Sequence, residues 1–445
     1  MKIQTFKILF ILLIVIFVGP EVSSSSNKGK ISESIPDVFV LFDTEKETEY
    51  AIVVEKSTQQ LFLYAYDGVY REIYRTNCST GEVSGAKTKS GDKKTPEGVY
   101  FFIKEYKKED LSPIYGTRSF PMDYPNILDR IADHDGNAIW MHGTNEPIKP
   151  YNSNGCIALE NDDIDKLAKY ITLNRTPIII VDKLSYLPSN SVNGIKESFL
   201  NFFSQSNDAL EKGTYHEYLK YYDHEYVPDI SWWADWDKLR KKLSVSYAPF
   251  SVKLERASVL KHKEVYVALF DLYIIAQDKR MFAGTKKLFL ADKGNHLKII
   301  GEEYQYLLDK KKKYKRKNPL ITASRNMKLA IDDERKIPDM IDGWLKAWSS
   351  KDIKRYANYY SKDFRSPEGV NLRKWLRYKS RLNRKYDYIH VSGDNLVINK
   401  GPKRGTVFFV QTYVSSGYSG VGIKKLIIKR ENGQWKIYRE TWEKM

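Results

Sequence analysis

The second half of the chain repeats itself at a fixed offset of 138 residues, and this feature constrains the fold more than any other. The matching segments and single positions are Tyr221-Tyr222 with Tyr359-Tyr360, Lys286-Lys287-Leu288 with Lys424-Lys425-Leu426, Lys298 with Lys436, Glu302 with Glu440, and Tyr304 with Trp442. The register holds without gaps at separated points. Such a register predicts two copies of one structural unit.

In each copy, amphipathic helices come first and long apolar strands follow. Helices are expected at 195–203 and 215–222, then at 341–348 and 353–360, with strands at 265–276, 282–290, 407–414 and 423–429. This order, with the phrase Trp-Leu-Lys-Ala-Trp-Ser-Ser-Lys-Asp at 344–352, resembles nuclear transport factor 2-like (SnoaL-like) domains. The resemblance implies two α+β cone-shaped domains, at 192–308 and 335–445. Such folds serve binding, dimerisation or spacing as well as catalysis, so the fold alone does not fix their role.

The segment before the repeat reads as mainly β. Alternating or apolar runs bounded by turn residues predict strands at 50–54, 60–66, 70–78, 98–103, 138–141 and 178–181. One helix is expected after Asp162, where Ile164, Leu167, Ala168 and Ile171 recur at helical spacing. These patterns predict a mainly β domain over residues 48–184.

Within this domain, a histidine and a cysteine stand fourteen positions apart. His142 ends a short apolar strand in Ile-Trp-Met-His-Gly-Thr, and Cys156 follows a glycine in Ser-Asn-Gly-Cys-Ile. A thiol becomes an effective nucleophile when a neighbouring base takes its proton, and histidine is the usual base. The two segments therefore predict cysteine-based acyl transfer.

The same segments resemble the signature of the L,D-transpeptidase (YkuD-type) family. Further positions agree with its pattern, namely the Ser-Thr-Gly that ends at Gly81, the Thr-Pro-x-Gly that begins at Thr95, Ser153, Leu159 and Asn161. The resemblance covers residues 48–184 and implies an L,D-transpeptidase-like β-sandwich with a helix after the cysteine motif.

The resemblance also implies roles for the site residues. Cys156 would be the nucleophile, His142 the base, and the Gly143 carbonyl the group that orients the imidazole. Backbone N–H groups of Gly155 and Cys156 would form the oxyanion hole. The remaining oxyanion or substrate-binding candidates are Ser153, Asn154, Thr144, Gly81 and Thr95. No cofactor or metal is expected.

Two positions depart from the family pattern. Asn154 stands where the family often has histidine, and Ala158 stands where it usually has arginine. A guanidinium there would bind a carboxylate or hold the motif loop, so its loss suggests altered substrate handling. The missing arginine and the order of domains resemble cell-shape L,D-carboxypeptidases of helical bacteria.

Three functions follow as hypotheses. The first is a peptidoglycan-modifying acyltransferase that cleaves the diamino acid–D-Ala bond of stem tetrapeptides through a Cys156 thioester and passes the acyl group to an amine. The second, held nearly equal, is an L,D-carboxypeptidase that uses water as acceptor. The third is a non-catalytic envelope-binding protein.

Other interpretations of the same residues are less favoured. A Cys78–Cys156 disulfide would consume the nucleophile, and Cys78 reads instead as a small buried hydrophobe. A metal hydrolase would need a ligand set from Asp129, Asp133, His134 and Asp135, whose spacing matches no metal motif.

The N-terminus and the charge distribution predict where the protein works. Residues 1–24 resemble an export signal, with a basic start and an apolar run at 8–18, and 25–47 read as a linker or N-terminal arm. An exported protein of the periplasm or cell envelope is expected. Residues 311–445 carry a net charge of +20, and a basic linker is expected at 309–334. An anionic envelope polymer or lipid headgroups are the expected counter-charges rather than nucleic acid, and a homodimer stays open.

Overall fold

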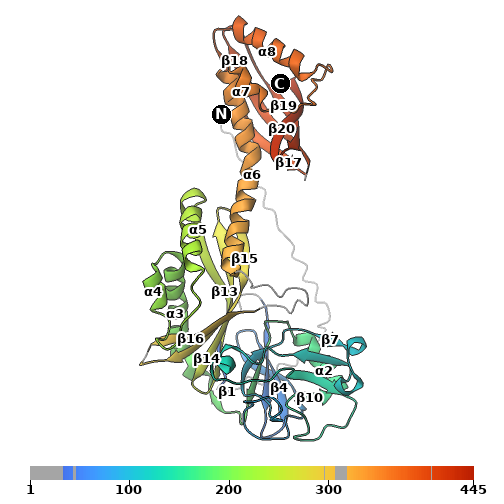
Figure 1. Ribbon diagram of the computed structural model, residues 1–445, viewed down its shortest axis with the longest axis vertical. Helices are drawn as coiled ribbons and strands as arrows, with labels where there is room; N and C mark the ends of the chain where they lie inside the picture. Colours follow the sequence, from blue (N-terminus) through green and yellow to red (C-terminus); the bar gives the residue numbers. More distant parts are fainter. Residues whose placement is uncertain (1–33, 44–46, 295, 306–317, 402) are drawn as a thin grey trace, which may run out of the picture. The chain divides into compact units, whose positions relative to one another are not determined.

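The computed structural model describes residues 34–43, 47–294, 296–305, 318–401 and 403–445 (Figure 1). The expected export signal lies outside these residues, as do parts of the expected arm and of the basic linker. The described chain divides into two compact units. The first contains the residues up to Lys196 together with Ser258–Val267, and the second contains Glu197–Ala257 and Ala268–Met445.

The first unit is built from two β-sheets around one core. The larger sheet has the order β5-β4-β3-β11-β6, with β3 (Glu49–Glu55), β4 (Gln60–Tyr66), β5 (Tyr70–Asn77), β6 (Gly98–Phe101) and β11 (Pro177–Val181). The smaller sheet has the order β10-β9-β8-β7, with β7 (Tyr106–Lys107), β8 (Arg118–Pro121), β9 (Trp140–Thr144) and β10 (Ile157–Glu160). Apolar residues of both sheets share one buried cluster, including Ile52, Leu63 and Ile178 from the first and Met141 and Leu159 from the second. The expected β-sandwich is confirmed.

The helix after the cysteine motif is α2 (Asn161–Leu167), continued by a 3-10 turn at Ala168–Tyr170. Its Ile164 and Leu167 are fully buried in the shared core. A second helix, α1 (Ile127–Ile131), was not expected from periodicity because it has only five residues. A capping box between Asn126 and Asp129 stabilises it.

The N-terminal arm contributes two strands to the first unit. β1 (Ser34–Pro36) pairs with β12 (Tyr186–Pro188), and β2 (Phe39–Phe42) pairs with residues 258–260 of β13 (Phe250–His262). The hairpin segment Ser258–Val267, which the sequence assigned to the first cone, therefore belongs with the first unit. Its partner strand β2 completes pairing that the hairpin would otherwise leave open.

The second unit contains the second copy of the repeat and most of the first, without the start of its first helix and the hairpin segment Ser258–Val267. The first has α3 (Asn193–Glu211), α4 (Tyr215–Leu219) and α5 (Trp233–Ser246) with strands β13, β14 (Val265–Ala276), β15 (Lys279–Asp292) and β16 (Leu297–Tyr304). The second has α6 (Pro319–Ser349), α7 (Ile353–Ala357) and α8 (Leu372–Lys385) with β17 (Ile389–Lys400), β18 (Arg404–Ser415), β19 (Tyr418–Glu431) and β20 (Gln434–Lys444). The second sheet runs in the order β17-β18-β19-β20. Each copy is thus helices followed by a sheet, as the sequence predicted.

The two copies also repeat their buried polar contacts. Lys286 pairs with Glu302 at 2.6 Å, and Lys424 pairs with Glu440 at the same distance. Tyr222 donates to Glu302 at 2.7 Å, and Tyr360 donates to Glu440 at 3.2 Å. The residues that recur at the offset of 138 therefore form the same contacts in each cone, namely a lysine–glutamate ion pair with a tyrosine bound to the glutamate. A charged pair inside a core is held only when both partners are satisfied.

Residues 319–334 are helical, where the sequence predicted the end of a linker. Asn318 caps α6 by accepting the Leu320 N–H, and Pro319 occupies the first turn, where its missing N–H is tolerated. Buried Leu320, Ser324, Met327 and Ile331 recur at helical spacing and continue the apolar face toward Trp344. Among the residues that the structure describes, no helix has the length and apolar character needed to cross a membrane.

Candidate active site

Strand alternation places the histidine and the cysteine on one face of the smaller sheet. β9 and β10 are parallel neighbours, with Ala158 opposite His142 and Ile157 opposite Met141. Side chains alternate between faces along a strand, so Met141 and Ile157 point into the core, where both are fully buried. Cys156 directly precedes β10, two positions before Ala158, and therefore shares the outer face with His142. The turn that precedes β10 thus delivers the thiol beside the imidazole strand.

A cavity of about 240 Å³ opens over this face. Cys156, His142, Ser153, Asn154 and Thr144 all line it, so the structure brings together five of the nine residues predicted from the sequence. Ala158 and Ser79 form part of the same wall. These two residues are joined by backbone hydrogen bonds of 2.9 Å in both directions.

The imidazole of His142 is fixed by its own neighbour. Its Nδ1 lies 2.6 Å from the carbonyl oxygen of Gly143, as the resemblance implied. A carbonyl can only accept, so Nδ1 carries the proton and Nε2 of the neutral ring keeps a free lone pair. The ring of Tyr115 meets the imidazole edge to face at 5.1 Å between centroids. His142 is buried, and this burial lowers its pKa although the Gly143 carbonyl opposes the shift.

The thiol of Cys156 lies 3.5 Å from the Ala138 carbonyl, to which it donates. Burial raises the pKa of the Cys156 thiol, while the backbone N–H of Trp140 and the charge of Lys87 oppose that shift. The raised pKa of the thiol and the lowered pKa of His142 mean that both the thiol and the imidazole are neutral at pH 7. The histidine is therefore available as a base, and the proton moves as the thiol attacks.

The turn before the cysteine requires glycine. Gly155 has φ of +112°, a region that side chains rarely adopt, and an added Cβ would lie 2.6 Å from the carbonyl oxygen of Lys94. The hydroxyl of Ser153 donates to the Cys156 carbonyl at 2.6 Å and accepts the Gly155 N–H at 3.2 Å. The Gly155 N–H, an expected oxyanion donor, is thus held by Ser153.

Gly81 and Thr95 lie behind this turn and do not line the cavity. The fully buried hydroxyl of Thr95 accepts the Gly81 N–H at 2.9 Å and donates to the Gly155 carbonyl at 3.0 Å. Both of its hydrogen-bonding roles are used by backbone groups. These two residues therefore support the cysteine turn from behind.

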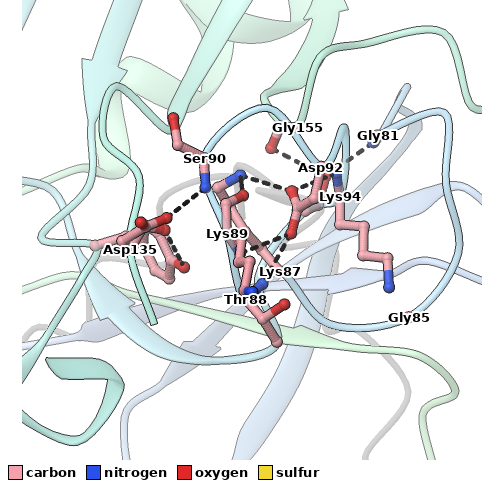
Figure 2. Close-up of polar contacts among 12 residues, drawn as sticks. Gly81, Gly85, Lys87, Thr88, Lys89, Ser90, Asp92, Lys94, Asp135 and Gly155 are labelled. Atoms are coloured by element: carbon pink, nitrogen blue, oxygen red, sulfur yellow. Dashed lines mark hydrogen bonds and ion pairs between the residues drawn. The ribbon is translucent and has the colours of Figure 1, made fainter. Parts of the chain in front are cut away.

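The loop that leads to Thr95 is organised around Asp92. Figure 2 shows its carboxylate between the ammonium of Lys87, at 2.7 Å, and the backbone N–H groups of Thr88, Lys89 and Lys94. Burial by itself raises the pKa of Asp92, but Lys87 and these N–H groups outweigh it and hold that pKa well below its ordinary value. The charged Asp92 fixes the loop whose Lys94 carbonyl packs on Gly155.

Lys56 anchors the same loop from the larger sheet. Its buried ammonium donates to the carbonyls of Gly85, at 2.6 Å, and Thr95, at 3.3 Å, and pairs with Glu97 at 3.1 Å. Lys263, from the hairpin that joins the first unit, reaches the other oxygen of Glu97 at 3.2 Å. Lys56 and Lys87, neither of which the sequence analysis predicted as part of the site, thus hold the loop behind the cysteine turn.

The helix after the cysteine motif begins away from the thiol along the chain. A helix beginning near Asp162 would lower the thiol pKa if its N-terminus faced Cys156. The four residues of β10 separate the two, and an extended strand of that length covers roughly 13 Å. The helix begins at the far end of β10, and the pKa of Cys156 is raised.

The other titratable candidates are separate from this site. Cys78 is a free thiol buried in the core, where burial raises its pKa to about 12. His134 and Asp129 lie 3.6 Å apart in the turn region before β9. Within the described ranges, no group of three or more His, Cys, Asp and Glu side chains has the geometry to hold a metal ion.

Comparison with known families identifies two parts of the chain. Residues 49–180 match the YkuD family, described as an L,D-transpeptidase catalytic domain, and residues 336–441 match the Cds6 C-terminal NTF2-like domain. A curated relative whose name places it among the L,D-transpeptidases, YafK of Escherichia coli (strain K12), is 28% identical over 123 residues. That match covers 27% of this chain and 46% of YafK, so the chain spans about half the length of the curated relatives it matches.

Solved structures of other bacterial proteins are similar over longer stretches. The helical cell shape determining protein Pgp2 from Campylobacter jejuni is 21% identical, with 60% of this chain and 96% of Pgp2 covered at a TM-score of 0.45. Bd1075 from Bdellovibrio bacteriovorus is 20% identical, with 93% and 99% covered at a TM-score of 0.32.

Proposed function

We propose that this chain, whose residues 49–180 form an L,D-transpeptidase catalytic domain, is a peptidoglycan-modifying cysteine acyltransferase. One observation carries the proposal. Cys156, in the turn just before β10, and His142, on the adjacent parallel strand β9, line one cavity, with the imidazole Nδ1 anchored on the Gly143 carbonyl. Nucleophile, base and orienting group are thus all present.

The substrate of the proposed reaction is a peptidoglycan stem tetrapeptide. The Cys156 sulfur attacks the carbonyl carbon of the diamino acid, and Nε2 of His142 takes the thiol proton. The tetrahedral oxyanion is stabilised by the Cys156 N–H and by the Gly155 N–H, once substrate displaces the contact of the latter with Ser153. The C–N bond then breaks, His142 returns its proton to the leaving D-Ala amine, and a thioester on Cys156 remains.

The second half of the reaction passes the acyl group to an acceptor. An amine from a neighbouring stem gives a cross-link and completes a transpeptidase cycle. Water gives a shortened tripeptide and completes an L,D-carboxypeptidase cycle. His142 acts as base toward either acceptor. The regenerated thiol ends both cycles.

The side chain at position 158 in the cavity wall supports hydrolysis as the second candidate reaction. Ala158 lies opposite His142 and contributes only a methyl group where the family pattern has a guanidinium. A guanidinium there would hold a carboxylate. Its absence supports altered positioning of the stem peptide and easier access of water to the thioester. We further propose that the protein acts outside the cytoplasm, where this substrate lies.

Product analysis tests the proposal. Purified protein and its Cys156→Ala variant are incubated with disaccharide tetrapeptide, and the products are read by mass spectrometry. A dimer that has lost one D-Ala identifies transpeptidation, and loss of D-Ala without a dimer identifies hydrolysis. If the wild type and the variant give the same products, the proposed acyltransferase is wrong and a non-catalytic binding role takes its place.

A further inference from the structure

Helix α8 presents an unusually cationic face. Arg373, Arg377, Arg381 and Arg384 recur at i, i+4, i+8 and i+11, which places their side chains on one side of the helix. Lys374 and Lys385 flank this row. All six residues are exposed, and the helix contains no acidic residue. Like charges at this spacing repel one another, so the row costs stability unless a partner neutralises it.

These six cations lack anionic partners among the described residues. Every salt bridge of the second cone is formed by other lysines and arginines, such as Lys400, Lys424 and Lys429. By contrast, Lys379 on the opposite face of α8 is buried, with its ammonium 3.5 Å from the centroid of the Trp348 ring. The helix is therefore anchored by one face and leaves its charged face open to solvent.

A groove of about 1260 Å³ runs along this face. Its walls come from α7, through Ile353 and Lys354, from the segment at 366–370, and from α8. Besides its cations, the groove is lined by the aromatic side chains of Trp375 and Tyr378, whose ring centroids lie 5.6 Å apart. Glu368 is the single acidic residue in the lining.

We propose that the α7–α8 groove binds a chain of an acidic polysaccharide. Guanidinium groups in a row suit carboxylates spaced along a polymer, because each can form two parallel hydrogen bonds. The exposed ring of Tyr378, supported by Trp375, offers an apolar face against which a sugar ring can pack. A concave groove fits a single polymer chain better than it fits a flat bilayer, because a bilayer surface would contact only the rims of the groove.

The proposal concerns a site distinct from the cysteine cavity and does not depend on the chemistry there. Such a groove would hold the enzyme on an anionic polymer while the catalytic domain acts. Its occupant is recognised by charge and sugar stacking. Binding should therefore weaken as salt screens the exposed cations.

The test measures binding of fluorescent polygalacturonate oligosaccharides to the full-length Cys156→Ala protein, so that turnover cannot interfere. The double variant Arg377→Gln/Arg381→Gln should bind about tenfold more weakly, and Tyr378→Ala should lose affinity even at high salt. A matched control, Lys362→Gln/Lys403→Gln, removes the same charge from exposed positions of the same cone outside the groove. It should bind like the parent, and circular dichroism confirms that each variant is folded.

Three results would overturn the proposal. One is equal binding by the groove variant and the control variant. A second is equal binding of neutral dextran oligosaccharides, which would remove the role of the carboxylates. The third is binding to phosphatidylglycerol vesicles without binding to polygalacturonate, which would identify a membrane surface as the partner.

Discussion

The Nδ1 atom of His142 lies 2.6 Å from the carbonyl oxygen of the next residue, Gly143. This backbone contact fixes both the tautomer and the plane of the ring, a task that an Asp or Asn side chain performs in other catalytic triads. An added Cβ at position 143 would lie 2.4 Å from the Asn161 amide oxygen, so a side chain there would displace Asn161 from its place beside the histidine strand. The basic Nε2 is therefore positioned by backbone geometry.

Replacement of His142 should remove the base and leave the fold intact. We expect His142→Gln to lower kcat by about 10²–10⁴-fold, the usual contribution of a positioned general base. The turnover of tetrapeptide measures the effect. His134→Gln serves as the control, because His134 does not line the cavity, and it should retain full activity. Equal losses in both variants would contradict a specific role for His142.

The pH dependence of thiol alkylation should reveal a neutral resting pair. Burial raises the pKa of Cys156 and lowers that of His142, so the thiolate fraction at neutral pH is small and rises only at alkaline pH. The rate of iodoacetamide modification should therefore increase with pH through a midpoint above the ordinary thiol value. Activity should persist as pH falls until it passes the lowered pKa of His142, below about 6.5. A modification rate that is already maximal at pH 6 would indicate a preformed thiolate–imidazolium pair and contradict this account.

The same experiment contains an internal control. Cys78 is buried in the core and its pKa is raised to about 12, so it should stay unmodified over the whole range. Peptide mapping after alkylation separates the two cysteines. Label on Cys78 in the folded protein would mean that the core opens on the timescale of the assay.

Gly155→Ala should abolish activity through the geometry of the cysteine turn. The substitution places a Cβ 2.6 Å from the Lys94 carbonyl at a φ of +112°, at a strain cost of about 1–3 kcal/mol. Gly68→Ala is a matched control, since Gly68 has φ of +104° but no atom within 4 Å of an added Cβ. We expect both variants to lose stability in urea unfolding and only Gly155→Ala to lose turnover. An active Gly155→Ala enzyme would refute the requirement for glycine.

The ion pair inside the second cone should be needed for its stability. Glu440→Ala leaves the Lys424 ammonium buried without its partner, and we expect a loss of about 3–5 kcal/mol in the free energy of unfolding. Glu443→Ala, an exposed position on the same strand, should change that free energy by less than about 0.5 kcal/mol. Urea unfolding followed by tryptophan fluorescence measures both. A small effect of Glu440→Ala would mean that water reaches Lys424.

Local motifs predicted much of the site, because its nucleophile and base lie in short segments with a distinctive residue order. The groups that complete it could not be predicted in the same way. The Trp140 N–H and the Ala138 carbonyl are backbone groups, which any residue carries. Lys56 and Lys87 hold the loop that packs behind the cysteine turn, and both come from segments far from Cys156 in sequence that only the fold brings together.

The fold, like the site, could be predicted from the sequence only in part. The 138-residue repeat predicted two related domains because identical positions build identical buried contacts. Helix α8 was not predicted from the sequence, because Lys379 lies on its buried face and interrupts the apolar pattern. The alternation of apolar and polar residues shows which face of a strand is buried, but it does not show with which strand it pairs. The place of the hairpin Ser258–Val267 in the first unit could therefore not be predicted.

The most direct test of the central claim is the intact mass of the protein after brief incubation with stem tetrapeptide and rapid acid quenching. We expect a covalent adduct with the mass of the peptide minus D-Ala, mapped to Cys156 and absent from Cys156→Ala. An adduct on Cys78, or release of D-Ala by the Cys156→Ala variant, would contradict it.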